Sequence, residues 1–155
     1  MPRFERAALV EKFKAMVARG EMKLDDPISL YLPKTVKSPT RNGKEITLVD
    51  LATHTSGLPR MPTNFKPKDP KNPFADYTDE LLYEFLSSYT LPRDIGSKYE
   101  YSNVGMGLLG HILTLKAKTD YETLVINRIS KPLKMNDTRI TLSTEQKSRL
   151  ATGHS

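Results

Sequence analysis

The sequence predicts a mainly α-helical fold with at most a short β-hairpin. Apolar side chains recur at helical spacing in several separate segments, whereas the hairpin signal is a single Asn42-Gly43 pair between short strand-like flanks. With 155 residues the chain is long enough to bury a core without disulfides. We therefore expect residues 1–155 to form a single domain.

The first predicted helix covers residues 6–19. Its apolar side chains follow the spacing of one helix face, and Gly20 supplies a C-terminal stop. These side chains are Leu9, Val10, Phe13, Met16 and Val17. Residues 24–33 follow as an irregular turn that contains two prolines.

A short helix and a long loop are predicted in the middle of the chain. Thr47 with Asp50 is the pattern of a capping box, and Gly57 and Pro59 are expected to end the helix that it opens. Prolines then become so dense that no regular ladder of hydrogen bonds can form. We expect residues 59–77 to be a proline-rich surface loop, and such long loops often border a site.

Two helices are predicted between the loop and residue 117. Thr78 caps the first, whose inward residues are Leu81, Leu82, Phe85 and Leu86. The second begins near Val104 and is expected to be buried. Its stripe is Val104, Leu108, Ile112 and Leu115, widened by Leu109 and Leu113. Gly105, Gly107 and Gly110 in this helix are costly unless another backbone packs closely there.

Two shorter helices complete the predicted elements. Asp120 opens one of them, with Tyr121, Leu124, Val125 and Ile129 as its apolar residues. Ser143 with Gln146 is a second capping box, for a last short helix.

Composition restricts the function classes. The net charge of +6 favours acidic partners, but the Lys and Arg residues are scattered and no nucleic-acid motif accompanies them, so nucleic acid is not favoured. The absence of cysteine excludes disulfides, thiolate zinc sites and cysteine nucleophiles. No apolar run approaches the roughly 20 residues of a membrane span. The N-terminal residues have no signal-peptide pattern, so localisation stays open.

Four segments carry a family resemblance: GEMKLDDPISLYLP at 20–33, ITLVDLATHTSGLP at 46–59, GSKYEYSNVGMGLLGHIL at 96–113 and ISKPLKMNDTRI at 129–140. Together, in order and in register, they resemble the serine β-lactamase-related family. This family contains class C β-lactamases, D-alanyl-D-alanine carboxypeptidases and related esterases. One such string is weak evidence, whereas four in register are specific.

The resemblance implies a two-lobed serine hydrolase with its active site between a helical lobe and an antiparallel sheet. The family's site combines Ser-x-x-Lys, Tyr-x-Asn and Lys-Thr-Gly or His-x-Gly, and Tyr101-Ser102-Asn103 matches the second motif. By this resemblance Tyr101 is the general base or proton shuttle and Asn103 is the catalytic and substrate-binding amide. Ser102 is a supporting residue. The parent reaction is acyl transfer from a β-lactam, a D-Ala-D-Ala peptide or an ester, and it uses no cofactor.

The other two motifs are missing from these residues. In the register of the resemblance, Arg3 and Arg6 stand where the serine and lysine belong, and a guanidinium is neither a nucleophile nor a base. Thr63 and Lys66 are the nearest approach elsewhere, but their loop does not provide the helical turn that would bring them together. We therefore expect the helical lobe of a partial family member, and no turnover by this chain alone.

Histidines and nearby hydroxyls offer weaker candidates. His54 and Ser56 are two residues apart in a segment expected to be a structural turn, which disfavours a catalytic pair. His111 fits a buried or groove histidine rather than a base, and His154 lies near the C-terminus. Three separated histidines predict no metal site.

Two alternatives remain open from the sequence. Spacing alone is also explained if Tyr101 packs at a helix entrance and Asn103 caps the helix. The chain is also compatible with a non-catalytic module that binds a small-molecule or peptidoglycan-like acyl ligand, or that self-associates through an exposed apolar face.

Overall fold

The computed structural model describes residues 3–152, with side chains described from residue 7 onward. Our expectations for the side chains of Arg3 and Arg6, and for His154, lie outside the described residues. Six α-helices and a two-stranded antiparallel sheet make up most of the regular structure of this part of the chain, which confirms the mainly helical prediction.

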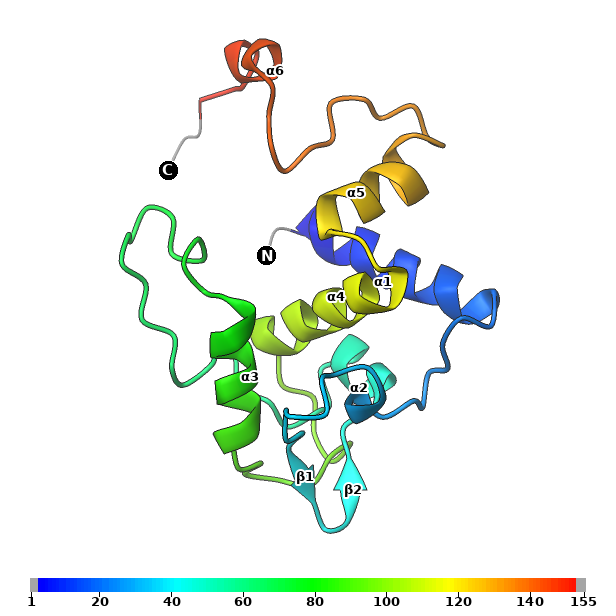
Figure 1. Cartoon of the computed structure of the whole chain (residues 1–155), viewed down its shortest axis with the longest axis vertical. Helices are drawn as coiled ribbons and strands as arrows, with labels where there is room; N and C mark the ends of the chain where they lie inside the picture. The colour runs from blue at the N-terminus through cyan, green and yellow to red at the C-terminus, as the bar shows by residue number, and fades with distance from the viewer. Residues whose placement is uncertain (1–2, 153–155) are drawn as a thin grey trace.

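Helix α4 (Asn103–Ala117) runs through the middle of the molecule (Figure 1). It is in contact with α1 (Arg3–Ala18), α2 (Leu48–Ala52) and α5 (Tyr121–Val125). Helix α3 (Asp79–Ser88) lies near its N-terminal end, and α6 (Thr144–Ser148) lies apart with the C-terminal segment (Figure 1).

The remaining elements are short. Strands β1 (Thr40–Arg41) and β2 (Lys44–Glu45) pair in an antiparallel register around Asn42 and Gly43, both of which have positive φ, so the predicted hairpin is confirmed. A 3₁₀ turn, η1, spans Ile28–Leu30 within the predicted irregular turn. A π-helical turn, η2 (Ile126–Ser130), continues α5.

The predicted caps account for most helix starts. The Thr47–Asp50 and Ser143–Gln146 capping boxes both form. The side chains of Thr78 and Asp120 are also N-caps, and each accepts a hydrogen bond from the backbone amide three residues later. Each cap satisfies an amide that has no partner inside its helix. Local chemistry therefore sets where these four helices begin.

The hydrophobic core lies on both sides of α4. Leu9, Phe13 and Met16 of α1 are buried in the same cluster as Leu108 and Ile112 of α4. Gly110 allows this approach, because a Cβ built there would lie 3.3 Å from Leu9 Cδ1. The close packing predicted for that glycine is therefore present, although a side chain rather than a backbone makes the contact.

Three local expectations were wrong. The short helix α2 ends at Ala52, before Gly57, and His54 adopts φ +60° just after it. Leu115 is 38% exposed and not part of the buried stripe: its spacing keeps it on the face of Val104 and Ile112, but the packing over that face does not extend to the last turn of α4. Gly107 has no atom within 4 Å of a built Cβ, so no close packing explains it.

Candidate active site

The Tyr101-Ser102-Asn103 segment lies where the connector from α3 enters α4. Ser102 is the N-cap of α4: its Oγ accepts a hydrogen bond from the Gly105 amide at 2.8 Å and donates one to the Pro59 carbonyl at 2.7 Å. Only 1% of Ser102 is exposed. This serine therefore joins the start of α4 to the 56–59 turn, and the helix cap is Ser102 rather than Asn103.

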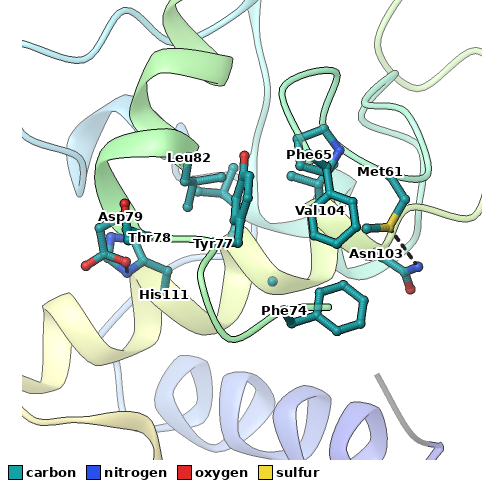
Figure 2. Close-up of a pocket in the computed structure, with 13 residues that line it drawn as sticks. Met61, Phe65, Phe74, Tyr77, Thr78, Asp79, Leu82, Asn103, Val104 and His111 are labelled. Carbon is teal, nitrogen blue, oxygen red and sulfur yellow. Dashed lines mark hydrogen bonds and ion pairs between the residues drawn. The ribbon is translucent and has the colours of Figure 1, made fainter. Parts of the chain in front are cut away.

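Asn103 is held through its backbone and presents its amide to a pocket. Its N–H donates to the Arg60 carbonyl at 3.0 Å, and the Val104 N–H points to the same oxygen at 3.4 Å. The side-chain nitrogen of Asn103 lies 3.4 Å from Met61 Sδ, which is a weak acceptor (Figure 2). A ligand carbonyl would be a better partner for this amide than the thioether.

His54 supports the segment from behind. Its carbonyl accepts a hydrogen bond from the Glu100 amide at 2.8 Å, and its Nδ1 accepts one from the Ser102 amide at 3.2 Å. A histidine that accepts at Nδ1 carries its ring proton on Nε2 in the neutral form. Since residues 100 and 102 both bind to His54, the backbone on either side of Tyr101 is fixed.

Tyr101 is half-buried and its ring packs on His54. The ring centroids are 4.7 Å apart with an interplanar angle of 41°, and Tyr99 contacts the same imidazole edge-on at 5.7 Å. The structure therefore brings Tyr101, Ser102 and Asn103 together with His54 at one corner of α4. Asn103 lines the adjoining pocket, whereas Tyr101 is not among the residues that line it.

A cavity of about 210 Å³ extends from Asn103 along α4. Its roof comes from the proline-rich loop, and Figure 2 shows Phe65, Phe74 and Tyr77 over the space, with Asn103 and His111 at opposite ends. The Phe65 ring is 5.3 Å from that of Phe74 and 5.8 Å from that of Tyr77. The cavity is therefore a largely apolar groove under an aromatic cover, which we call the α4 groove.

Polar side chains close the far end of the α4 groove. The hydroxyl of Tyr83 lies 2.7 Å from His111 Nε2, and His111 Nδ1 lies 3.5 Å from a carboxylate oxygen of Asp79. Burial raises the pKa of Tyr83, and the carboxylates of Asp79 and Glu80 raise it further. The Tyr83 hydroxyl therefore keeps its proton and can donate a hydrogen bond to His111 Nε2.

Tyr77 is anchored in the same region. Its hydroxyl donates to Asn64 Oδ1 at 3.0 Å and lies 3.3 Å from the Leu81 carbonyl. Burial raises the pKa of Tyr77 to about 12, with a smaller contribution from Glu84. This neutral tyrosine fixes the loop to α3 and helps to shape the roof of the α4 groove.

The weaker sequence candidates do not assemble a second site. The buried Oγ of Ser56 accepts from the Leu58 amide at 3.3 Å, while Nδ1 of His54 is bonded to the Ser102 amide. Thr63 and Lys66 are on a stretch of turns, not on a helix. No group of three or more potential metal ligands occurs among the described residues. Within the same residues, no helix is long and apolar enough for a transmembrane segment.

Sequence reasoning missed two features of this site. His54 was expected only in a structural turn, yet it contacts two residues of the Tyr-Ser-Asn motif. The proline-rich loop was expected to border a site and His111 to be a buried or groove histidine, but the α4 groove that they form with Asn103 was not predicted. A signal was present, since Asn103, Gly107 and His111 are four residues apart and so lie on one face of a helix.

The sequence of the chain is similar to those of known proteins. The Beta-lactamase family model matches residues 13–155. A D-alanyl-D-alanine-carboxypeptidase/endopeptidase, AmpH, from Escherichia coli (strain K12) is 39% identical over 140 residues, which cover 90% of this chain and 36% of that protein. A beta-lactamase of the same strain is 30% identical over 140 residues, covering 89% of this chain and 33% of that protein.

Solved structures agree with these sequence matches. A beta-lactamase/D-alanine carboxypeptidase from Yersinia pestis, complexed with citrate, superimposes with a TM-score of 0.85 at 33% identity, covering 94% of this chain and 41% of that one. A class C beta-lactamase from Rhodobacter sphaeroides gives a TM-score of 0.67 at 32% identity, covering 96% of this chain and 37% of that one. The chain thus spans about two fifths or less of the length of these relatives.

Proposed function

The chain belongs to the beta-lactamase family, and from this premise we propose that it forms the helical wall of a serine hydrolase site. The substrate is an acyl donor: a β-lactam, a D-alanyl-D-alanine peptide or an ester. In this proposal Tyr101 is the general base or proton shuttle, and Asn103 is the amide that positions the acyl group. Ser102 and His54 hold both in place.

The observation that carries the proposal is the position of Asn103. Its backbone is fixed by the Arg60 carbonyl and by the Ser102 cap, and its side chain reaches the mouth of an apolar groove. An amide held in this way can donate to a substrate carbonyl without losing much conformational freedom. Placement of the acyl group is therefore the part of the reaction that these residues are best arranged to perform.

The chemistry assigned to Tyr101 needs groups that are not present in the 155 residues. A serine hydroxyl attacks the acyl carbonyl, its proton passes to the tyrosine, and the leaving group later takes that proton. A tyrosine with an ordinary pKa near 10 acts as a base at neutral pH only if cations stabilise its phenolate. No Ser-x-x-Lys occurs in the sequence, so we propose that this chain binds and orients the acyl donor but does not itself turn it over.

Two assays test the proposal. The purified chain is incubated with a chromogenic cephalosporin and with a p-nitrophenyl ester, and its intact mass is measured; we expect no turnover and no acyl adduct. Binding of an N-acyl-D-alanyl-D-alanine peptide is then measured by NMR, and we expect Asn103→Ala to weaken it on the order of tenfold. Turnover that survives Tyr101→Phe would show that the assigned residues are wrong.

A non-catalytic binding or self-associating module is the second candidate, and one surface feature favours it. Leu30 and Leu115 are exposed and line a common shallow depression together with Tyr31, at whose edge Lys116 and Lys118 also lie. Clustered exposed apolar side chains promote association. Light scattering distinguishes this candidate: concentration-dependent dimers that disappear in Leu30→Lys would support it, and a monomer at all concentrations would count against it.

A further inference from the structure

A second cavity lies between α1 and the chain around η2, and its volume is about 440 Å³. Helix α1 is in contact with η2 and lies beside α5, which η2 continues (Figure 1). Sites for small molecules usually have volumes of roughly 300 to 1,000 Å³. This cavity, which we call the α1–η2 cavity, shares no lining residue with the α4 groove.

The walls of the α1–η2 cavity are mainly apolar. Aliphatic and thioether side chains from both sides form them: Met16, Leu124, Ile129, Leu133 and Met135. Ala8 and Ala15 also line the cavity and are seven residues apart on one face of α1, where their small side chains leave room. An aliphatic tail gains free energy by leaving water for such a lining.

Positive charge predominates at the same cavity. The cations that line it are Lys12, Arg19 and Arg128. Its single lining carboxylate is Glu11, which pairs with Lys14 at the surface, 2.9 Å away. Glu21, outside the cavity, pairs with Arg19 and lies 3.7 Å from Arg128. The neighbouring carboxylates are therefore bound to other cations, and Lys12 is left without one among the described residues.

The ammonium of Lys12 is buried without a partner. Lys12 is 4% exposed, and its Nζ has no hydrogen-bond partner among the described residues. Burial, with smaller contributions from the guanidinium groups of Arg128 and Arg19, lowers the pKa of Lys12 to about 8. The ammonium is thus still charged at pH 7, and an anion beside it would supply hydrogen bonds and offset this repulsion. Since the lysine stem is flexible, the ammonium can turn from the wall toward an anion in the cavity.

We propose that the α1–η2 cavity binds a carboxylate with an aliphatic tail, that is, a medium-chain fatty acid. The carboxylate pairs with the ammonium of Lys12 and the guanidinium of Arg128, and the tail lies against Met16 and Leu133. One unpartnered ammonium matches one negative charge, which favours a carboxylate over a dianionic phosphate. The assignment does not depend on the proposed function, because Asn103 does not line this cavity.

Octanoate and 1-octanol test the proposal, because they share a tail and differ in charge. Calorimetric titration of the full chain at pH 7 should give an affinity on the order of tenfold higher for octanoate. Acetate lacks the tail and should not bind measurably. Methionine methyl signals in NMR locate the ligand: those of Met16 and Met135 should shift, whereas that of Met61 in the α4 groove should not.

Three variants make the result specific. Lys12→Met should bind the two ligands equally, and a melting temperature at or above that of the parent excludes unfolding as the cause. Lys14→Met is the matched control and should keep the preference, because Lys14 is exposed and does not line the cavity. Ala15→Leu should weaken both ligands on the order of tenfold by filling the cavity, while leucine preserves the helix.

Each outcome decides for or against the fatty-acid site. A preference for octanoate that is lost in Lys12→Met, kept in Lys14→Met and accompanied by shifts at Met16 and Met135 would support it. Equal affinity of the parent chain for octanoate and octanol would overturn it, as would tighter binding of octyl phosphate than of octanoate. Dimers that alter the Met16 and Met135 signals, without octanoate binding, would also overturn it and identify a second copy as the occupant.

Discussion

Two regions of the molecule differ in how their buried polar atoms are hydrogen-bonded: the corner that holds Ser102, and the interface between α1 and η2. At the corner, Ser102, Ser56 and His54 are all buried and all take part in hydrogen bonds. At the interface, Lys12 is 4% exposed and Ser130 is 1% exposed, yet neither Lys12 Nζ nor Ser130 Oγ has a hydrogen-bond partner among the described residues.

At the α1–η2 interface, the missing hydrogen-bond partners affect the charge of Lys12. Burial lowers the pKa of Lys12 from its usual 10.5 to about 8, and the guanidinium groups of Arg128 and Arg19 lower it further. Burying a polar group without a partner costs free energy, whereas a satisfied buried network holds one conformation. The hydrogen bonds around the candidate site therefore hold that part of the chain in one conformation. At the α1–η2 interface, by contrast, substitutions can raise the free energy of unfolding without changing the candidate site.

Removing the cap should have the largest effect. In Ser102→Ala, the partly buried Pro59 carbonyl loses its donor and the Gly105 amide loses its acceptor. We expect the free energy of unfolding to fall by about 3 to 4 kcal/mol, as measured by urea denaturation. Ser143→Ala at the exposed cap of α6 is the control and should cost about 1 kcal/mol or less. Equal losses would mean that the corner is no more constrained than the surface.

The α1–η2 interface should respond in the opposite direction. Lys12→Met keeps the aliphatic length but removes the buried charge, so we expect about 2 to 3 kcal/mol of added stability at pH 7. Because the pKa of Lys12 is lower in the folded state, the unfolded chain binds more protons between about pH 8 and 10.5. The stability of the parent chain should rise across this window, and the advantage of the variant should disappear.

The exposed Lys14 provides the control for this change. Its ammonium pairs with Glu11 at the surface, 2.9 Å away. Exposed pairs of this kind contribute little, so Lys14→Met should change stability by about 0.5 kcal/mol or less, with no such pH dependence. If Lys12→Met behaves like Lys14→Met, the ammonium of Lys12 is not buried in solution.

His54 separates two contributions within the corner. His54→Ala should cost about 2 kcal/mol, because the Ser102 amide loses its acceptor and the imidazole contacts with the Tyr99 and Tyr101 rings are lost, while the strain of φ +60° stays. His54→Gly also loses the acceptor, but glycine adopts φ +60° without strain. We therefore expect the glycine variant to be about 1 kcal/mol more stable than the alanine variant. Thermal unfolding of the two variants measures the difference. Equal stabilities would mean that the left-handed backbone is not retained.

The two glycines of α4 give the smallest expected effect. Gly107→Ala should stabilise the protein by about 1 kcal/mol, because the new methyl group meets open space in a helix. Gly110→Ala should gain less or lose stability, because its Cβ would lie 3.3 Å from Leu9 Cδ1. Chemical denaturation of both variants checks the order, and the reverse order would contradict the open space beside Gly107 in the α4 groove.

The fold was predictable from the sequence to the extent that local chemistry determines it. The Thr47–Asp50 capping box, the Asn42-Gly43 turn and the apolar spacing of α1 each act over a few residues, and each is present in the structure. His54 shows the limit, because its hydrogen bond to Ser102 joins residues 48 positions apart. Pairing over such a distance is decided by packing, which periodicity does not encode.

The candidate site also has a part that the sequence predicts and a part that it does not. Tyr101 and Asn103 were identified from a motif in the sequence, and their catalytic roles stay predictions. Their surroundings were not predictable, because the α4 groove depends on how a proline-rich loop folds over α4. Leu115 failed for a related reason: its helical spacing is that of a buried residue, but no neighbouring element covers it.

A single NMR titration tests the central claim most directly. The ¹⁵N-labelled chain is titrated with N-acetyl-D-alanyl-D-alanine, and the amide and side-chain signals are followed residue by residue. We expect the largest shifts at Asn103 and at the residues bonded to it around Arg60 and Ser102, with none at Lys12 or Ser130 across the molecule. Shifts confined to the α1–η2 interface, or no saturable shift at Asn103, would contradict an acyl-binding wall at the start of α4.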